Sequence, residues 1–376
     1  MRKRIGAAAA LLAGCAAPAA PPGEVREATA FTVEVRMENG AGETVTAPRL
    51  LAFGGQRMNV QVLRQESYIQ SFEIENGVAN PVVATLHAGV LLDGRVVPGG
   101  GGDASAFEYR LQIVDPERPF REYRYEAAPK SEVTIQIPTV HRVEVEGTAW
   151  FPDGEERLLA SLPDPAGTGS FRIRARIVPA RLTAEELDGL VLSTSVPVTP
   201  PATRSSGWYR VRSGTVEGEW KQGDVVEGAA LDSLLAKGAV KVTGDLQWSA
   251  APEAPARASL LEERAYVRDF EPVEGDDSAI GGPIVDKLAT GLLADAGALG
   301  EVSCTLSSLV RPVQTFTTSL GRPERPVTIE LPEIHILRAR AAAAGGLRLL
   351  VLGTRNGGGS DAVLLSFRPG ATGPEE

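Results

Sequence analysis

The residues best suited to acid–base or metal chemistry are three histidines, His87, His141 and His335. Two of them close the same phrase: Val-Thr-Ile, Gln or Glu, Ile or Leu, Pro, two residues, His. It occurs at 133–141 and again 194 positions later. One His per phrase makes no metal site without partners, and no Cys or His stands at ligand spacing. His141 and His335 have the parity of the apolar residues that follow them, which predicts packing in a core. We expect no metal and no cofactor.

Three other stretches raise the question of chemistry. The run from Gly99 to Asp103 (GGGGD) lacks the Lys-Ser/Thr of a phosphate loop, which favours a hairpin tip. The stretch from Glu274 to Asp277 (EGDD) lacks calcium-loop spacing and is interpreted as a solvated loop. Cys304 lies in a strand-like run, VSCTLSSLV, which predicts a buried, inert thiol. No Gly-x-Ser-x-Gly elbow occurs, so we predict a protein that is not an enzyme. An envelope hydrolase stays a remote alternative, because catalytic groups converge in space.

The N-terminus has the pattern of a lipoprotein export signal. A basic segment, Met1 to Arg4, precedes a short apolar run and then Leu12-Ala13-Gly14-Cys15, which resembles a bacterial lipobox. This implies a signal peptide over 1–14 and acylation of Cys15, with 15–30 as lipidated Cys and flexible, Pro-rich tether. Because Ala16 is not Asp, the resemblance implies an outer-membrane lipoprotein, facing the periplasm or the cell surface. Its acyl chains would bind the membrane.

Composition restricts the remaining partners. The chain of 376 residues has a formal charge of −10 and no basic stripe, which argues against nucleic acid. Its 41 Gly and 27 Pro favour turns and short strands over long helices.

The repeated phrase belongs to a longer internal duplication. The segment that contains Tyr68 and Phe72 matches the segment that contains Tyr266 and Phe270. Further matches, in the same order, pair Gly89 with Gly291, Arg118 with Arg311 and Tyr123 with Phe316, as well as the strand starts at Phe31 and Phe171. At spacing four on a strand, each Tyr and Phe would share a face. Core packing between sheets is the favoured interpretation of Tyr68, Phe72, Tyr266 and Phe270, with an oligomer or partner surface as the functional alternative.

Period-two alternation around Val133 and Val327 predicts half-buried strands that end, bulge or lie at an edge where Pro138 and Pro332 follow. We therefore predict a mainly β fold of two homologous, antiparallel β-rich units with one or two short helices. Unit one covers 31–162, a linker 163–169, and unit two 170–367, with an insertion at 190–240 that holds a helix at 229–237. Residues 368–376 form a disordered tail.

The ordered segments resemble the secretin domain of bacterial type II and type III secretion systems. Ala47-Pro48-Arg49-Leu50 with Gly55-Gln56, the phrase at 133–138 and the hairpin at 148–159 follow the order of that family, and unit two repeats the ending at 347–353. The family's closing motif is absent after Gly353, its periplasmic N domains have no counterpart, and most members have one such domain where this chain has two.

The resemblance implies a non-enzymatic, lipid-anchored component or accessory of an outer-membrane secretion or envelope complex. A second copy of the chain or a secretion-complex protein would be its partner. The alternative is a monomeric or dimeric binding and scaffolding lipoprotein that has lost pore formation. Pairing of unit one with unit two inside one chain would favour that alternative.

Overall fold

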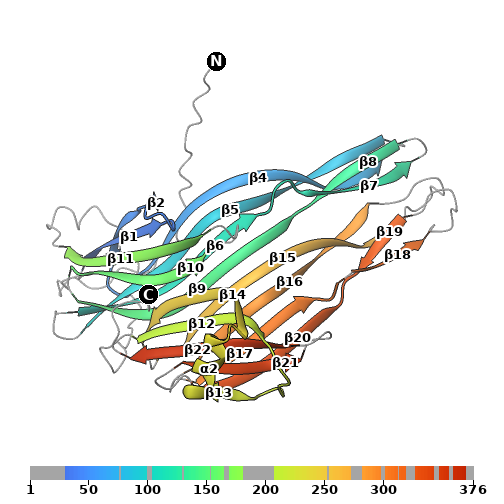
Figure 1. Cartoon of the computed structure of the whole chain (residues 1–376). Coiled ribbons are helices and arrows are strands. Elements are labelled where there is room, and N and C mark those ends of the chain that lie inside the picture. Colours follow the sequence, from blue (N-terminus) through green and yellow to red (C-terminus); the bar gives the residue numbers. More distant parts are fainter. Residues whose placement is uncertain are drawn as a thin grey trace, which may run out of the picture.

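The computed structural model describes a chain made almost entirely of antiparallel strands (Figure 1). The described residues run from 30 to 369, with gaps at 76–77, 100–103, 129–130, 153, 165–168, 181–206, 252–253, 272–281, 298–300, 312, 319–326, 343–346 and 355–358. The predicted signal peptide, Cys15, the Glu274–Asp277 stretch, most of the Gly99–Asp103 run and residues 370–376 of the predicted tail lie outside them. The tail prediction of 368–376 is wrong for its first two residues, because Arg368 and Pro369 still pair in the last strand. The mainly β prediction is confirmed.

Two large sheets form the body. The first has eight strands in the order β20 (Ile334–Ala342), β17 (Glu301–Leu309), β16 (Pro283–Ala296), β15 (Ala256–Phe270), β9 (Thr139–Pro152), β6 (Ala104–Pro116), β5 (Val78–Pro98) and β4 (Arg57–Glu75). The second runs β13 (Val225–Glu227), β21 (Arg348–Thr354), β22 (Ser360–Pro369), β12 (Gly207–Val216), β14 (Val240–Ala250), β10 (Glu156–Pro163), β11 (Ser170–Ala180), β1 (Ala30–Glu38) and β2 (Thr44–Thr46), with β3 (Arg49–Phe53) also paired to β1.

The sheets are held face to face by one apolar core. Alternation along each strand directs every second side chain inward. Phe107 and Val143 of the eight-stranded sheet meet Ile173 and Trp248 of the ten-stranded sheet, and all four are fully buried. Because this core takes side chains from both halves of the chain, the two units share one hydrophobic interior.

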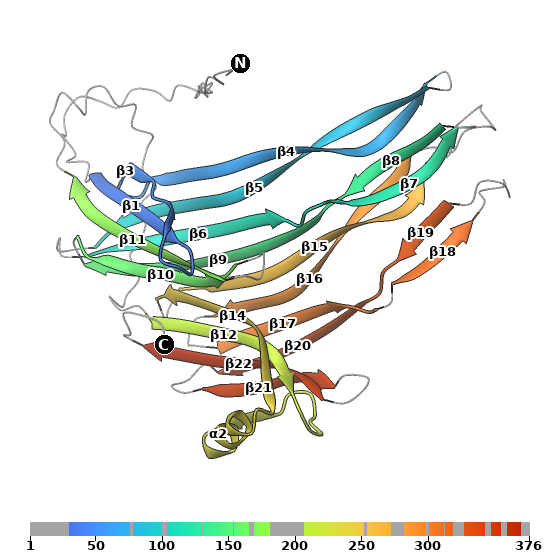
Figure 2. The ribbon, with the colours of Figure 1, turned by 45° about the horizontal axis from the view of Figure 1, so that its top comes forward.

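The long strands continue beyond the second sheet and carry two hairpins at their far end (Figure 2). These hairpins are β7 (Arg121–Ala128) with β8 (Ser131–Ile137), and β18 (Gln314–Thr318) with β19 (Val327–Leu331). Pro138 and Pro332 stand between each hairpin and the long strand that follows, as their missing N–H groups predict. The repeated phrase is therefore one hairpin strand, a proline break and the start of one long strand.

The strand order repeats along the chain. One row of directly paired residues crosses the eight-stranded sheet: Leu63, Gly89, Val114, Arg142, Leu261, Gly291, Ser307 and Ile336. Its last four members follow its first four at the sequence separations of the matched segments. Gly89 and Gly291 also share a left-handed backbone, with φ of 135° and 136°. The eight strands therefore consist of two four-strand sets in the same register.

The boundary between the sets differs from the prediction. Residues 163–169 lie in the connection of the hairpin β10–β11, with Pro163 paired to Ser170, and they separate no domains. The strand that contains Phe171 is β11, which pairs with β1 itself. The counterpart of β1 in the second set is β12, because β12 pairs with β22 and β14 as β1 pairs with β11 and β3. The predicted match of Phe31 with Phe171 is therefore wrong, because two strands with the same alternation of apolar and charged residues occupy different positions in the fold.

The insertion of the second set contains the predicted helix. Helix α2 spans Ala229–Ala236, and its Leu231 is fully buried, while Leu234 and Leu235 pack against the same apolar cluster. The i, i+3, i+4 spacing thus places all three on the face that covers β21 and β22. Within the described residues, no helix has the length and apolar character that crossing a bilayer requires.

Candidate functional site

The histidines do not converge. His141 is half-buried on β9, whereas His335 is exposed on β20, so the prediction of core packing is wrong for His335. The reason is its strand: β20 is the last strand of its sheet, and no strand among the described residues pairs with it on the outer side. Three strands lie between β9 and β20, which keeps the two histidines apart, and His87 is exposed. Among the described residues, no three His, Cys, Asp or Glu side chains are placed to hold a metal ion.

Cys304 is fully buried in the main core, as its strand-like surroundings predict. Burial raises the pKa of its thiol to about 12, and the charge of Asp295 adds to that increase. Because the thiolate is the reactive form, this cysteine is poorly suited to nucleophilic chemistry.

The four aromatic residues predicted as a packing or partner set divide between two environments. Tyr68 is buried with its ring against Phe120, at 6.0 Å between centroids. Phe270 is buried at the hairpins, and Phe72 packs there too, while Tyr266 is half-buried. A register shift falls between Tyr and Phe in β4 and again in β15, so the expected four-residue spacing on one face does not hold. Burial favours the packing interpretation, since a buried side chain offers no surface to a partner.

The outer face of the eight-stranded sheet, opposite the core, bears a row of polar and charged residues. This row, here called the charged row, consists of Asn59, Asp93, Arg110, Glu146, Arg257, Asp295, Ser303 and Arg340, each directly paired with the next. Within it, Arg257 Nε donates to Asp295 Oδ1 at 2.6 Å, and Asn59 donates to Asp93. Opposite charges on adjacent strands stabilise this register.

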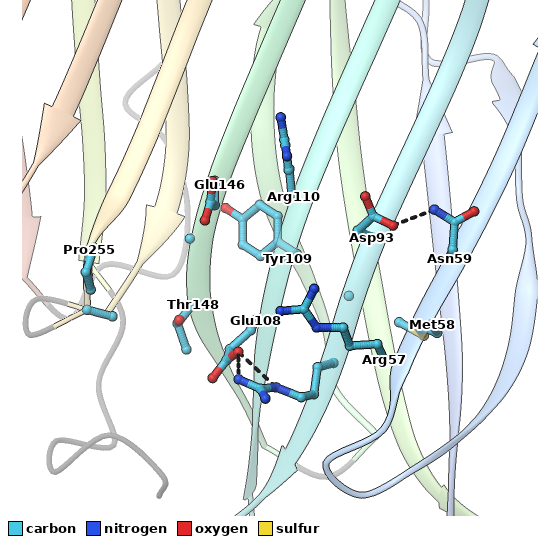
Figure 3. Close-up of a pocket in the computed structure, with 14 residues that line it drawn as sticks. Arg57, Met58, Asn59, Asp93, Glu108, Tyr109, Arg110, Glu146, Thr148 and Pro255 are labelled. Atoms are coloured by element: carbon cyan, nitrogen blue, oxygen red, sulfur yellow. Dashed lines mark hydrogen bonds and ion pairs between the residues drawn. The ribbon is translucent and has the colours of Figure 1, made fainter. Parts of the chain in front are cut away.

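A groove of about 900 Å³ lies over part of the charged row, between β4 and β9 (Figure 3). Two basic residues of its wall have acidic partners: Arg95 donates to Glu108 at 3.0 Å, and Arg110 to Glu144 at 2.8 Å. Arg57 is exposed at the rim, where Figure 3 shows its guanidinium between β4 and Glu108. Acids and bases compensate one another here, so the groove presents a polar, nearly neutral surface. Among the described residues that line this groove, no nucleophilic side chain lies beside a group that could deprotonate it.

The most specific geometry lies where the two sets meet. Strand β9 of the first set pairs with β15 of the second over eight residue pairs, from Glu146 with Arg257 to Thr139 with Arg264. The hairpins repeat this contact at the far end: Tyr123 Oη donates to Thr328 O at 2.6 Å and accepts from Thr328 N at 3.1 Å. We call this arrangement the internal joint.

Glu330 anchors the internal joint electrostatically. It accepts from Arg121 Nη2 of the first set at 2.9 Å and from Arg264 Nη2 of its own set at 3.1 Å. Burial of Glu330 opposes its ionisation, but the hydrogen bonds and charges of the two arginines outweigh burial and hold the pKa of this carboxyl below its ordinary value. The carboxylate therefore remains charged and binds the hairpins together.

The outermost strands, β4 and β20, pair with no described strand on their outer side. Side chains of other segments do reach their backbones: Ile69 N of β4 donates to Gln136 Oε1 at 3.0 Å, and Arg338 O of β20 accepts from Gln222 Nε2 at 3.2 Å. Exposed apolar side chains gather on or near them: Val62 of β4 is 47% exposed, Ile336 of β20 is 50% exposed, and Phe316 of the adjacent hairpin is 54% exposed. Unpaired strand edges with apolar side chains are templates for pairing with another chain. These two edges, here called the open edges, are the candidate functional site. Sequence patterns could not identify them, because strand order, and not strand pattern, decides which strand is last.

Comparison with protein-family models, curated proteins and solved structures found no match for this chain.

Proposed function

We propose that this chain is a lipid-anchored envelope protein of two degenerate secretin-like units, and that it acts without catalysis as a component or accessory of an outer-membrane secretion or envelope complex. One observation carries this: two four-strand sets join head to tail in a single sheet and leave an open edge at each end. A sheet with an unpaired strand at each end can be extended by strand pairing with another chain.

The repeated register supports common descent of the two units. Both sets have four long strands, a hairpin inserted between the third and the fourth, and a glycine at positive φ in the second. This recurrence agrees with the order of segments on which the secretin resemblance rests.

The anchor is tested by replacing the predicted acylation site. Cys15→Ser is expected to move the protein from the membrane fraction to the soluble fraction of fractionated cells, with Cys304→Ser as the control that stays in the membrane. Unchanged membrane association of Cys15→Ser would refute the anchor.

A binding and scaffolding lipoprotein is the second candidate, and the internal joint favours it, because β9 and β15 satisfy each other within one chain. The two candidate functions predict assemblies of different size. Extraction in mild detergent, followed by light scattering and electron microscopy, is expected to show multimers of the full chain. A strict monomer would exclude the first candidate and leave the second.

A further inference from the structure

The internal joint uses only one edge of each set, and the same edges recur unpaired at the two ends of the sheet. Strand β9 occupies the place in the first set that β20 occupies in the second, and β4 stands to the first set as β15 stands to the second. We infer that β20 of one copy pairs antiparallel with β4 of a second copy in the register of the internal joint. This inference rests on the proposed function and names the partner at the open edges.

The internal joint specifies the register between copies. In it, Val143 lies opposite Leu260, and Glu144 lies opposite Ser259. Transferring these pairs to the equivalent positions places Leu337 of one copy opposite Val62 of the next.

The same transfer continues on both sides of that pair. Arg338 lies opposite Gln61, and Arg340 lies opposite Asn59, which extends the charged row from one copy to the next. Ile336, which is 50% exposed, lies opposite the half-buried Leu63 and so gains an apolar neighbour.

The side chains of the two edges suit this pairing. Val62 on β4 is 47% exposed, and Leu337 on β20 packs only partly against the main core, whereas Val143, its counterpart within the chain, is fully buried. A groove of about 440 Å³ that Val62 and Val45 help to line opens beside β4.

Arg338 and Arg340 have no ion-pair partner within the described part of the chain, and Asp93 lies beside Asn59 on the other edge.

The hairpins give a second, independent contact. Tyr123 of the first set reaches Thr328 of the second through both hydrogen bonds of its hydroxyl. Its counterpart Phe316 is 54% exposed. Between copies, Phe316 would lie over Thr134 of the next chain, beside the apolar cluster that holds Ile69.

This contact joins two different edges and is therefore head to tail. Repetition gives a ring if the rotation closes and a filament if it does not. A two-fold dimer made of two β4 strands or two β20 strands is not what this register predicts.

Cysteine cross-linking tests the register in the full, membrane-bound chain. Gln61→Cys with Arg338→Cys, and Val62→Cys with Leu337→Cys, each place the two thiols opposite one another. Adjacent pairs of an antiparallel ladder alternate in spacing, so one of the two suits a disulfide better. Within one chain the thiols lie at opposite ends of an eight-stranded sheet, too far apart to bond. Mild oxidation is expected to give a reducible ladder of dimers, trimers and larger species.

The matched control is Gln61→Cys with Leu337→Cys, in which a shift by one residue directs the thiols to opposite faces. It is expected to remain monomeric. Monomers in both matched pairs, or an equal ladder in the control, would overturn the inference. As a second measurement, Val62→Asp is expected to abolish native multimers, whereas Val242→Asp, at a strand position 45% exposed and away from the edges, keeps them. Multimers that persist in Val62→Asp would count against the pairing of β20 with β4 between copies, and the separate fractionation of Cys15→Ser tests the anchor independently.

Discussion

The positive-φ glycines Gly89 and Gly291 allow a quantitative test of the repeated register. A Cβ on Gly89 would lie 2.1 Å from the carbonyl oxygen of Val62 on the paired strand, and a Cβ on Gly291 would lie 2.1 Å from that of Leu260. Neither neighbour is the end of a flexible side chain, so the backbone itself must move. Alanine also disfavours their φ values of 135° and 136°.

The expected cost follows from these two effects. A non-glycine residue in a sparsely populated backbone region costs about 1–3 kcal/mol. Forcing a methyl group into a closed space costs about 1–3 kcal/mol more. Gly89→Ala and Gly291→Ala should therefore each lower the free energy of unfolding by about 2–6 kcal/mol.

Gly238→Ala is the matched control, because Gly238 has φ of 67° but nothing within 4 Å of its added Cβ. It should lose only about 1–2 kcal/mol, the backbone term alone. Urea unfolding of the non-acylated Cys15→Ser chain, followed by tryptophan fluorescence, measures all three values. If Gly89→Ala or Gly291→Ala costs no more than Gly238→Ala, the close approach of the paired strands at these glycines is refuted.

Three further predictions concern the internal joint and the core. Glu330→Gln should destabilise the chain by about 1–2 kcal/mol at pH 7, measured by urea unfolding. Because the folded pKa of Glu330 is lowered, this contribution is present above its unfolded pKa and is lost as pH falls through the folded pKa. The two unfolding curves should therefore converge in acid, and a constant difference would contradict the ion pairs with Arg121 and Arg264. Tyr123→Phe should cost about 1–3 kcal/mol by leaving the N–H and C=O of Thr328 unpaired, whereas an unchanged midpoint would show that water replaces the hydroxyl. Cys304 should resist maleimide in the native state and react once the chain is unfolded, since burial raises the pKa of its thiol to about 12; rapid native labelling would contradict that burial.

Several features depended on local pattern alone and could be predicted. Alternation around Val133 and Val327, and the prolines that follow, predict strands and their ends because side-chain direction and the missing N–H are properties of neighbouring residues. Helix α2 follows from its three leucines in the same way. The duplication could be predicted because similar segments follow one another in the same order in both halves of the chain.

Other features required the tertiary structure. The exposure of His335 depends on β20 being the last strand, and the burial of Tyr68 depends on Phe120, which is remote in sequence. The register shift between Tyr68 and Phe72 has no local signal, and it moves an aromatic residue to a different environment.

The sequence by itself determined strand content and turns, because both are encoded by residues close together in the chain, and the order of similar segments predicted the repeat. The tertiary structure decided which strands join and which remain open, because hydrogen-bond pairing between distant segments decides it. The open edges are for that reason a property of the folded sheet and of no single motif.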